Sequence, residues 1–317
     1  MDRNLALEFV RVTEAAAIAA VQWLGRGDKK AADQAAVDAM RSRFNVIDFC
    51  GEVVIGEGEK DEAPELYIGE KLGKKTCGVE LDIALDPLEG TDSVANGAPN
   101  AISVIATGWR GSLFHAPDMY MDKIACGRKA KGAISLNASV EKNLKNVAKK
   151  LEKEVSELVV MVLDRPRHED LIKQIRSAGA RVRLISDGDV AGAIAPSLWE
   201  SGIDLLLGIG ASAEAVLASI AIKCLGGDFQ ARLMPKDDEQ KAKLKKIGIK
   251  NIDKILTLED LAKGEDLTFT ATGVIDGPLL KGVRYTANHC LTHSVVMRVK
   301  TGTVRFIETR HRLDDKF

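Results

Sequence analysis

The spacing of apolar residues along the chain predicts two helices at its beginning, followed by strands. Apolar side chains recur at helical spacing over residues 5–23, with alanines between them. The glycine-containing segment 25–28 interrupts this pattern, and a second helix is expected over about residues 30–43. Three shorter segments that follow predict strands: 53–55, 79–86 and 101–107.

The second half of the chain repeats a strand, a turn and a helix. The continuous apolar run 158–163 is followed by a polar turn and a helix. Strands at 181–185 and 204–207 each precede another helix, the first opened by Asp187-Gly188-Asp189 and the second starting near Ser212. Such repeats predict parallel βα units, whose ligands bind beyond the carboxyl ends of the strands.

The remaining segments complete a two-domain prediction. Residues 241–250 predict a basic, solvated helix, and the tail 267–307 predicts strands. A change in composition between residues 136 and 157 places the expected domain boundary there. We therefore expect an N-terminal α+β domain over residues 1–140 and a C-terminal α/β domain over residues 141–317.

Composition and charge limit the classes of partner. Of the 317 residues, 45% are hydrophobic and 29% are charged, which is typical of a soluble enzyme. The formal net charge of −1 gives no long-range attraction to nucleic acid or anionic membranes, so we expect neither as a partner. No apolar run reaches the length of a bilayer span, and the first residues do not resemble a signal peptide.

The cysteines indicate a reducing compartment. They are far apart in the sequence and show no CxxC spacing: Cys50, Cys77, Cys126, Cys224 and Cys290. An odd number of cysteines cannot all pair within one chain. We therefore expect reduced thiols and a cytoplasmic location.

Acidic residues gather where the predicted strand 79–86 ends. Asp86 is the last residue of that strand, because Pro87 has no N–H group with which to continue the ladder. Glu89 follows in a turn that Gly90 permits, and Thr91 begins a segment that predicts a helix. Two carboxylates, a hydroxyl and backbone N–H groups in one turn suit Mg²⁺ or Mn²⁺ beside a phosphate. The alternative is an ordinary acidic turn exposed to solvent.

Three further carboxylates fit a cation site. Asp33 shares the apolar face of its predicted helix, where a carboxylate is costly unless it is paired or bound to metal. Glu57 stands between two glycines in the loop after a strand, and Glu214 lies in the first turn of a helix. The alternatives are a buried salt bridge for Asp33, an exposed loop acid for Glu57 and a favourable helix-end charge for Glu214.

Residues suited to anions and hydroxyl groups follow the strands of the second half. Two arginines in Arg165-Pro166-Arg167 make a candidate phosphate clamp, since guanidinium groups bind phosphate oxygens in pairs. The carboxylates of Asp187-Gly188-Asp189 can accept bonds from sugar hydroxyls, or Asp187 can cap a helix. The hydroxyl of Tyr120 can donate to a phosphate, although the ring can also simply pack in the core.

Other catalytic motifs are missing from the sequence. The five histidines show no HExxH or paired spacing, so we interpret them as structural or incidental. Neither a Gly-x-Ser-x-Gly elbow nor a Walker loop occurs. The carboxylate and arginine segments are therefore the candidates for chemistry.

Taken in order, these segments resemble the class II fructose-1,6-bisphosphatases, including the cyanobacterial enzymes that also act on sedoheptulose 1,7-bisphosphate. The matching segments are Val54-Ile55-Gly56-Glu57-Gly58-Glu59, Asp86-Pro87-Leu88-Glu89-Gly90-Thr91, Ala116-Pro117-Asp118-Met119-Tyr120-Met121, Arg165-Pro166-Arg167 and Asp187-Gly188-Asp189-Val190. The resemblance extends over nearly the whole chain. It implies a layered αβαβα sandwich of the sugar-phosphatase type, similar to fructose bisphosphatase and inositol monophosphatase.

The resemblance also implies the roles of individual residues. Metal ligands are expected at Asp33, Glu57, Asp86, Glu89 and Glu214. Substrate contacts are expected from Glu89, Gly90, Thr91, Tyr120, Arg165, Pro166, Arg167, Asp187, Gly188, Asp189 and Ala211. The first predicted domain, with four of these five metal ligands, is expected to bind metal, and the second is expected to bind substrate. Mg²⁺ or Mn²⁺ is the expected cofactor and a homo-oligomer, dimer or tetramer, the expected assembly.

The implied reaction is hydrolysis of the 1-phosphate of fructose 1,6-bisphosphate, in gluconeogenesis or the Calvin cycle. Thr91 is expected to orient or deprotonate the attacking water together with Glu57 or Asp61. Two alternatives stay open at this stage. The chain may instead act on inositol or nucleotide phosphates with the same metal chemistry, or it may bind a sugar phosphate without turnover.

Overall fold

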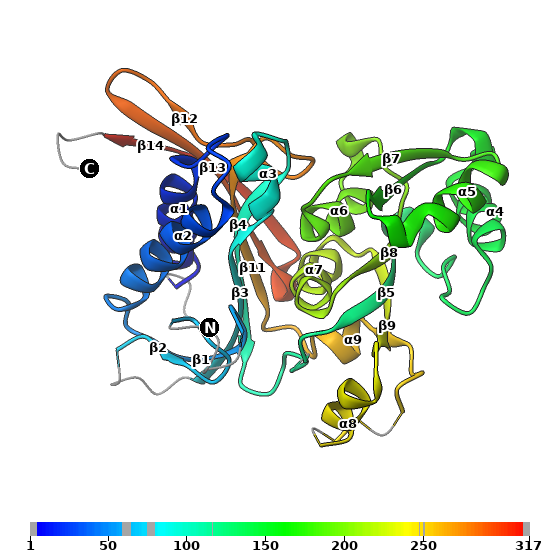
Figure 1. The fold of residues 1–317 in the computed structure, drawn as a ribbon, viewed down its shortest axis with the longest axis horizontal. Helices are drawn as coiled ribbons and strands as arrows, with labels where there is room; N and C mark the ends of the chain where they lie inside the picture. Colours follow the sequence, from blue (N-terminus) through cyan, green and yellow to red (C-terminus); the bar gives the residue numbers. More distant parts are fainter. Residues whose placement is uncertain are drawn as a thin grey trace. The chain divides into compact units, whose positions relative to one another are not determined.

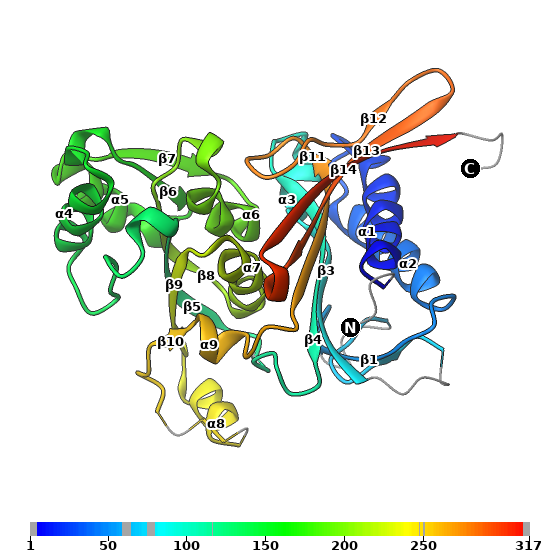
Figure 2. The same cartoon turned by 180° about the vertical axis from the view of Figure 1, so that it is seen from behind.

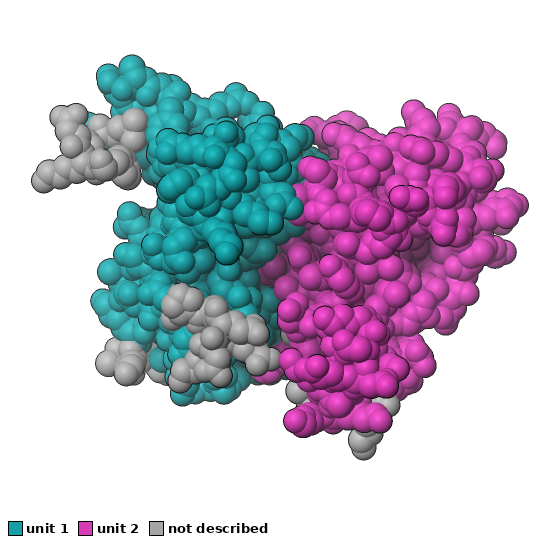
Figure 3. Space-filling view, viewed as in Figure 1, with its two compact units in different colours: residues 1–113, 264–317 teal, residues 114–263 magenta. Residues whose placement is uncertain are grey.

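The computed structural model describes residues 5–58, 65–74, 80–115, 117–246, 248–249 and 251–312 (Figures 1 and 2). The chain divides into two compact units, coloured separately in Figure 3. The first unit combines Met1–Leu113 with Gly264–Phe317, and the second is Phe114–Lys263. This division differs from the expected boundary after residue 140, because the C-terminal strands return to pair with the N-terminal ones.

The first unit places helices on one face of a mixed sheet. Its helices are α1 (Leu5–Val21), α2 (Lys29–Phe44) and α3 (Thr91–Asn96). Its strands are β1 (Cys50–Ile55), β2 (Lys71–Leu72), β3 (Glu80–Glu89), β4 (Ala101–Trp109), β11 (Thr268–Ile275), β12 (Arg284–Tyr285), β13 (His289–Arg298) and β14 (Thr303–Arg312). The order in the sheet is β12-β13-β11-β4-β3-β1-β2, and β14 pairs with β13. β1 runs parallel to β3, whereas β4 runs antiparallel to it.

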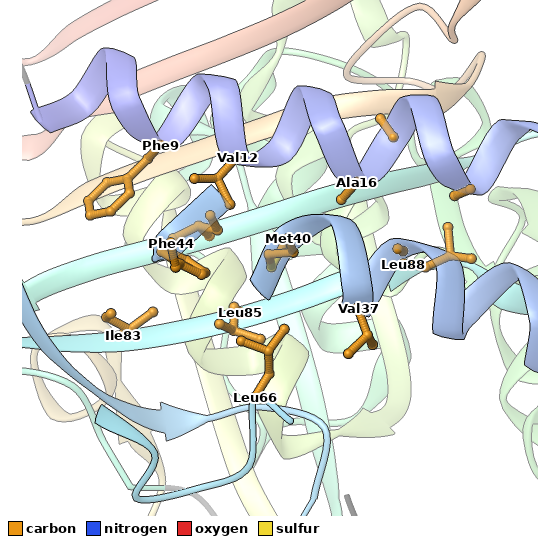
Figure 4. Close-up of a cluster of buried hydrophobic side chains, with 14 of the residues drawn as sticks. Phe9, Val12, Ala16, Val37, Met40, Phe44, Leu66, Ile83, Leu85 and Leu88 are labelled. Carbon is orange, nitrogen blue, oxygen red and sulfur yellow. The ribbon is translucent and has the colours of Figure 1, made fainter. Parts of the chain in front are cut away.

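The core of this unit lies between the two long helices and β3 (Figure 4). Phe9 on α1 and Phe44 on α2 are fully buried, and their ring centroids are 6.2 Å apart in an edge-to-face arrangement. Phe49 completes the aromatic group, 5.4 Å from Phe9. Ile83 and Leu85 of β3 lie beneath the helices in the same cluster. The helix that carries Asp33 is therefore fixed by apolar packing.

We expect Phe44→Ala to destabilise the protein by about 3–5 kcal/mol, because a buried aromatic ring is removed and its cavity can collapse only in part. Any activity that depends on Asp33 should fall with the folded fraction, since α2 carries this candidate ligand. Urea unfolding followed by circular dichroism measures the change. Val46→Ala is the control, because Val46 is 64% exposed and its truncation should cost less than about 0.5 kcal/mol. Equal losses in both variants would contradict this picture of the core.

The second unit also layers helices on a mixed sheet. Its helices are α4 (Val140–Leu151), α5 (Glu169–Ser177), α6 (Asp189–Ile194), α7 (Ser212–Leu225), α8 (Asp238–Lys246) and α9 (Leu258–Leu261). Its strands are β5 (Tyr120–Cys126), β6 (Val159–Leu163), β7 (Arg181–Ile185), β8 (Leu205–Ala211), β9 (Asp228–Met234) and β10 (Leu256–Thr257). The order is β10-β9-β5-β8-β6-β7. The parallel βα units are confirmed, because β6 runs parallel to both β7 and β8.

Antiparallel strands make this sheet mixed and were not expected from the sequence. β5 pairs antiparallel with β8 on one side and β9 on the other. The segment 136–157, where a boundary was expected, instead contains α4, whose residues Leu144 and Val147 are fully buried in the core of the unit. Its charged outer face explains the change in composition there. Both units confirm the predicted α/β sandwich class.

Two further expectations can be compared with the described residues. No helix within them is long and apolar enough to cross a membrane. Cys126, Cys224 and Cys290 are not disulfide-bonded, but Cys50 is, so the expectation of uniformly reduced thiols fails at that position. Cys77 lies outside the described residues.

Candidate active site

The carboxylates of the first unit begin at the end of β3. Asp86 pairs with Val104 of β4 and Glu89 pairs with Ile102, with an irregular register between them. The strand therefore continues through Pro87 as a bulge, which corrects the expectation that it stops at Asp86. A bulge turns side chains away from the regular alternation of a strand. Glu89 is thereby placed in a buried position, 4% exposed, three residues beyond Asp86.

Gly90 connects this bulge to α3. Its φ of +103° lies in the left-handed region that favours glycine. A Cβ atom at this position would also lie 2.8 Å from the carbonyl oxygen of Asn100. The tight turn lets α3 begin at Thr91, as predicted, directly after Glu89. The hydroxyl of Thr91 thus follows the strand-end carboxylates without an intervening loop.

Contacts with α3 hold the beginning of α2 beside this turn. Asp28 caps α2 by accepting a hydrogen bond from Ala31 N–H at 3.0 Å. The next residue, Lys29, forms an ion pair of 3.3 Å with Asp92 in the first turn of α3. The N–H of Gly25 donates to Val94 in α3 at 2.8 Å. Asp33 lies one turn further along α2, so these contacts determine where its carboxylate is held.

Glu57 leaves the sheet beside Asp86. The parallel register pairs Ile55 with Ala84, and both acidic residues lie two positions beyond this pair. The carboxyl ends of adjacent parallel strands reach the same edge of a sheet. The N–H of Glu57 donates to Leu66 at 3.1 Å, which fixes the loop.

Two of these carboxylates have raised pKa values. Burial, together with a smaller effect from the nearby negative charge of Asp33, raises the pKa of Glu57 to about 7. Burial also raises the pKa of Asp33. Two desolvated carboxylates that repel one another are stabilised by a bound cation. Within the described ranges, however, no three His, Cys, Asp or Glu side chains are already gathered as a metal site.

In the second unit, Arg167 and Tyr120 are brought together. The Arg167 guanidinium lies 4.7 Å from the centroid of the Tyr120 ring, a cation–π contact. Its Nε and Nη2 atoms also donate to Ile209 O, at 3.1 and 2.9 Å. Tyr120 pairs with Ala211 at the adjacent ends of β5 and β8. The candidate clamp residue is thus anchored to β8 and faces an aromatic ring that is 47% exposed.

His168 hydrogen-bonds to the backbone at Ile209, the residue whose carbonyl binds Arg167. Ile209 N–H donates to His168 Nε2 at 2.7 Å, so Nδ1 carries the hydrogen and donates to Leu163 O at 2.8 Å. Burial is the main cause that lowers the pKa of His168, consistent with a neutral ring. The structural interpretation made from the sequence therefore fits this histidine. It connects the strand end before Arg165 to β8.

Arg165 lies beside the next strand end. Its guanidinium donates to Ser186 O and to Asp164 O, and it approaches Asp187 Oδ1 at 3.9 Å. Gly188 has a φ of +83° and precedes α6. Asp189 is therefore the first residue of that helix, and it is only 7% exposed.

Asp189 and Glu214 both lie near the ammonium group of Lys123, a residue that was not predicted to belong to the site. Lys123 Nζ lies 2.5 Å from Asp189 Oδ2 and 3.9 Å from Glu214 Oε2. A signal was available, because Lys123 lies on the same face of β5 as Met121 and Ala125, which are both fully buried. A lysine on an apolar strand face requires a partner.

The Glu214 side chain has a buried oxygen whose negative charge is balanced, among the side chains that the structure describes, only by Lys123, at 3.9 Å. Glu214 Oε2 is buried and accepts no hydrogen bond from any described residue. Burial raises the pKa of Glu214, and Lys123 opposes this effect. A buried carboxylate oxygen without a donor is suited to a cation.

The predicted residues divide between the two units, and contacts link some of them in pairs, such as Arg167 with Tyr120 and Arg165 with Asp187. The first-unit cluster consists of Asp33, Glu57, Asp86, Glu89 and Thr91. The second-unit cluster consists of Tyr120, Arg165, Arg167, Asp187, Asp189 and Glu214. Each is described within its own unit. Asp61, predicted to assist Thr91, lies outside the described residues.

Comparisons with known proteins agree with this chemistry. The family described as "Bacterial fructose-1,6-bisphosphatase, glpX-encoded" matches residues 3–311. A class 2 fructose-1,6-bisphosphatase of Haemophilus influenzae is 49% identical, covering 100% of this chain and 98% of the relative. A D-fructose 1,6-bisphosphatase class 2/sedoheptulose 1,7-bisphosphatase of a Synechococcus species is 45% identical over 99% of this chain and 97% of the relative.

Among solved structures, an extragenic suppressor protein of Pyrococcus furiosus is similar over 60% of this chain and 68% of that one, with 13% identity and a TM-score of 0.30. A structural similarity this low does not support a conclusion about the fold. The sequence matches, by contrast, extend over essentially the whole chain. The chain therefore belongs to the family of bacterial, glpX-encoded fructose-1,6-bisphosphatases.

Proposed function

We propose that this chain hydrolyses the 1-phosphate of fructose 1,6-bisphosphate, releasing inorganic phosphate and a sugar monophosphate in a reaction that requires a divalent cation. The observation that carries the proposal is the pair of desolvated carboxylates, Asp33 and Glu57, held at the sheet edge where Asp86 and Glu89 also leave β3. Carboxylates held this close together repel one another, and a bound divalent cation would offset this repulsion and bind a phosphate beside them.

The carboxylates that we propose as cation ligands are Asp33, Glu57, Asp86 and Glu89 in the first unit and Glu214 in the second. All five supply carboxylate oxygens, the ligand type that Mg²⁺ and Mn²⁺ prefer. When bound, a divalent cation neutralises the charge of the phosphate and lowers the pKa of water. The raised pKa of Glu57 and the uncompensated Oε2 of Glu214 support this donor set.

Thr91 and Glu57 act on the attacking water in this proposal. Thr91 orients the water through its hydroxyl group, and a carboxylate accepts the proton that the water loses. Glu57, in the loop after β1, is the first candidate acceptor of this proton. Asp61 is the second candidate acceptor.

The second-unit cluster binds the part of the substrate that does not react. Arg165, Arg167 and Tyr120 hold the 6-phosphate, and Asp187 and Asp189 accept hydrogen bonds from the sugar hydroxyls. Arg167 supports this role because the ring of Tyr120 and the carbonyl of Ile209 already fix its guanidinium. Binding energy from the remote phosphate then positions the reacting end.

Phosphate release by the purified protein tests the function. We expect release from fructose 1,6-bisphosphate with Mg²⁺ or Mn²⁺, loss of release with EDTA, and at least a tenfold lower kcat/KM for fructose 1-phosphate, which lacks the 6-phosphate. Arg167→Ala should remove most of this discrimination, while Arg176→Ala, in the exposed last turn of α5, should preserve it. Folded protein that releases no phosphate with either cation would contradict the proposal.

Sedoheptulose 1,7-bisphosphate is the second candidate substrate, because the Synechococcus relative is named for both activities. Parallel assays at equal concentration decide between the two esters. Inositol and nucleotide phosphates belong in the same panel, and tight binding of a bisphosphate without turnover would indicate a sensor. A homo-oligomer and a cytoplasmic location complete the proposal, and size-exclusion chromatography with light scattering tests the first.

A further inference from the structure

Lys123 is a buried charge in the middle of a sheet. Its side chain is 1% exposed, and its strand β5 lies between β8 and β9. Burying an ammonium group is costly, and an apolar residue of similar volume is often as stable or more stable at such positions. An ammonium group at this position therefore points to a role beyond packing.

The neighbouring strand β8 leaves space for this charge. A Cβ atom on Gly210 would lie 2.0 Å from Asp189 Oδ2 and 2.8 Å from Lys123 Nζ. A Cβ atom on Gly208 would lie 3.1 Å from the ring of His168. The absence of a side chain at Gly210 is thus required for the close contact between Lys123 and Asp189.

The two carboxylates near Lys123 are held differently. Asp189 Oδ2 forms a hydrogen-bonded ion pair with Nζ at 2.5 Å. Glu214 Oε2 lies 3.9 Å away, beyond hydrogen-bond distance, and accepts no hydrogen bond from the described residues. The positive charge of Lys123 is thus paired mainly with Asp189, and it balances the negative charge of Glu214 only weakly.

We propose that Lys123 is a positioning residue that assigns different tasks to two adjacent carboxylates: it holds Asp189 in place for the sugar hydroxyls and leaves Glu214 for the cation. This inference rests on the proposed function of the site. Lys123 itself is too deeply buried to touch a substrate. Asp189, neutralised by its ion pair, remains an acceptor for hydroxyl groups but is a poor ligand for a second cation.

Binding experiments that need no turnover test the inference. The variants are Lys123→Met, Asp189→Asn and the double variant, which removes both members of the ion pair and so does not leave a charged Asp189 without its partner. Calorimetry measures the Kd of fructose 1,6-bisphosphate in EDTA and, separately, the Kd of Mn²⁺. Lys223→Met is the matched control, because Lys223 forms an ion pair of the same length, 2.5 Å, with Glu259 elsewhere in the same unit.

We expect Lys123→Met to weaken binding of the bisphosphate at least tenfold and Asp189→Asn to do the same. The double variant should be no weaker than Asp189→Asn, because residues that act through one another give non-additive effects. Lys123→Met should also bind Mn²⁺ several-fold more tightly, since Asp189 becomes available as a ligand, and this gain should disappear in the double variant. A purely structural role would not produce a gain in cation binding.

Several results would overturn the inference. They are an unchanged Kd for the bisphosphate in folded Lys123→Met, additive losses in the double variant, or an equal loss in Lys223→Met. Gly210→Ala provides a second test, because the added Cβ atom pushes Asp189 away from Lys123 without removing either charge. Normal binding of the bisphosphate by Gly210→Ala would count against the inference. Wild-type protein that binds the bisphosphate but releases no phosphate would refute the proposed function alone, whereas wild-type protein that does not bind it would refute both.

Discussion

Asp86→Asn is expected to lower kcat/KM for fructose 1,6-bisphosphate by roughly a thousandfold or more. The substitution preserves the shape of the side chain, and its amide oxygen can still accept the hydrogen bond that Asp86 Oδ1 receives from Leu88 N–H at 3.0 Å. It removes one negative charge from the donor set of a divalent cation. Loss of cation-assisted stabilisation of about 4 kcal/mol corresponds to a thousandfold in rate.

The same strand offers a matched control for this effect. Asp82 lies four residues before Asp86, is 2% exposed and accepts a hydrogen bond from Leu113 N–H at 3.1 Å. Asp82→Asn also removes a buried charge from β3, yet it should keep activity within about threefold. Steady-state assays at saturating Mn²⁺, with thermal unfolding to check folding, measure both variants. Comparable activities in the two would show that the charge of Asp86 has no catalytic use.

Glu57→Gln is expected to lower kcat at least a hundredfold and to change how stability depends on pH. The lower kcat follows from the loss of both a ligand and a proton acceptor. The pH effect follows from the raised pKa of Glu57, about 7 in the folded, cation-free protein against 4.5 ordinarily. The folded protein therefore holds this proton more tightly than the unfolded chain does.

The sign of the pH effect is determined by this difference. The contribution of the protonated carboxyl group is complete below about pH 4.5 and is lost as the pH rises through about 7. Its size is at most roughly 3 kcal/mol. In EDTA, the free energy of unfolding should therefore fall between pH 5.5 and 8, and Mn²⁺ should restore more of it at the higher pH.

Urea unfolding at several pH values, in EDTA and in Mn²⁺, measures this dependence. Glu57→Gln should flatten the curve in EDTA and reduce the stabilisation by Mn²⁺. Glu52→Gln is the control on the same strand, where Glu52 forms an ion pair with Arg110 at 2.8 Å, and it should keep both the slope and the activity. A wild-type curve that rises with pH across this window would rule out a buried, protonated Glu57.

The local pattern of apolar and polar residues was sufficient to predict many of the helices and strands. The periodicity of the first 44 residues predicted α1 and α2 within a few residues, and the predicted strand 181–185 coincides with β7. The two helices bury one face against a core, so their sequences carry the period of that face. β5 was missed because Lys123 breaks its apolar pattern, and the bulge after Asp86 was missed because it depends on pairing with β4.

The sequence alone indicated the residue types that we propose for the chemistry: carboxylates in the loop after β1 and at the end of β3, the arginines after β6 and the acids at the start of α6. Their order along the chain also identified the family. Only the tertiary structure decided that the C-terminal strands join the first unit, that Arg167 lies against Tyr120, and that Lys123 pairs with Asp189. These features depend on contacts between residues far apart in the chain, and local periodicity does not record such contacts, because it reflects only which face of each element is buried.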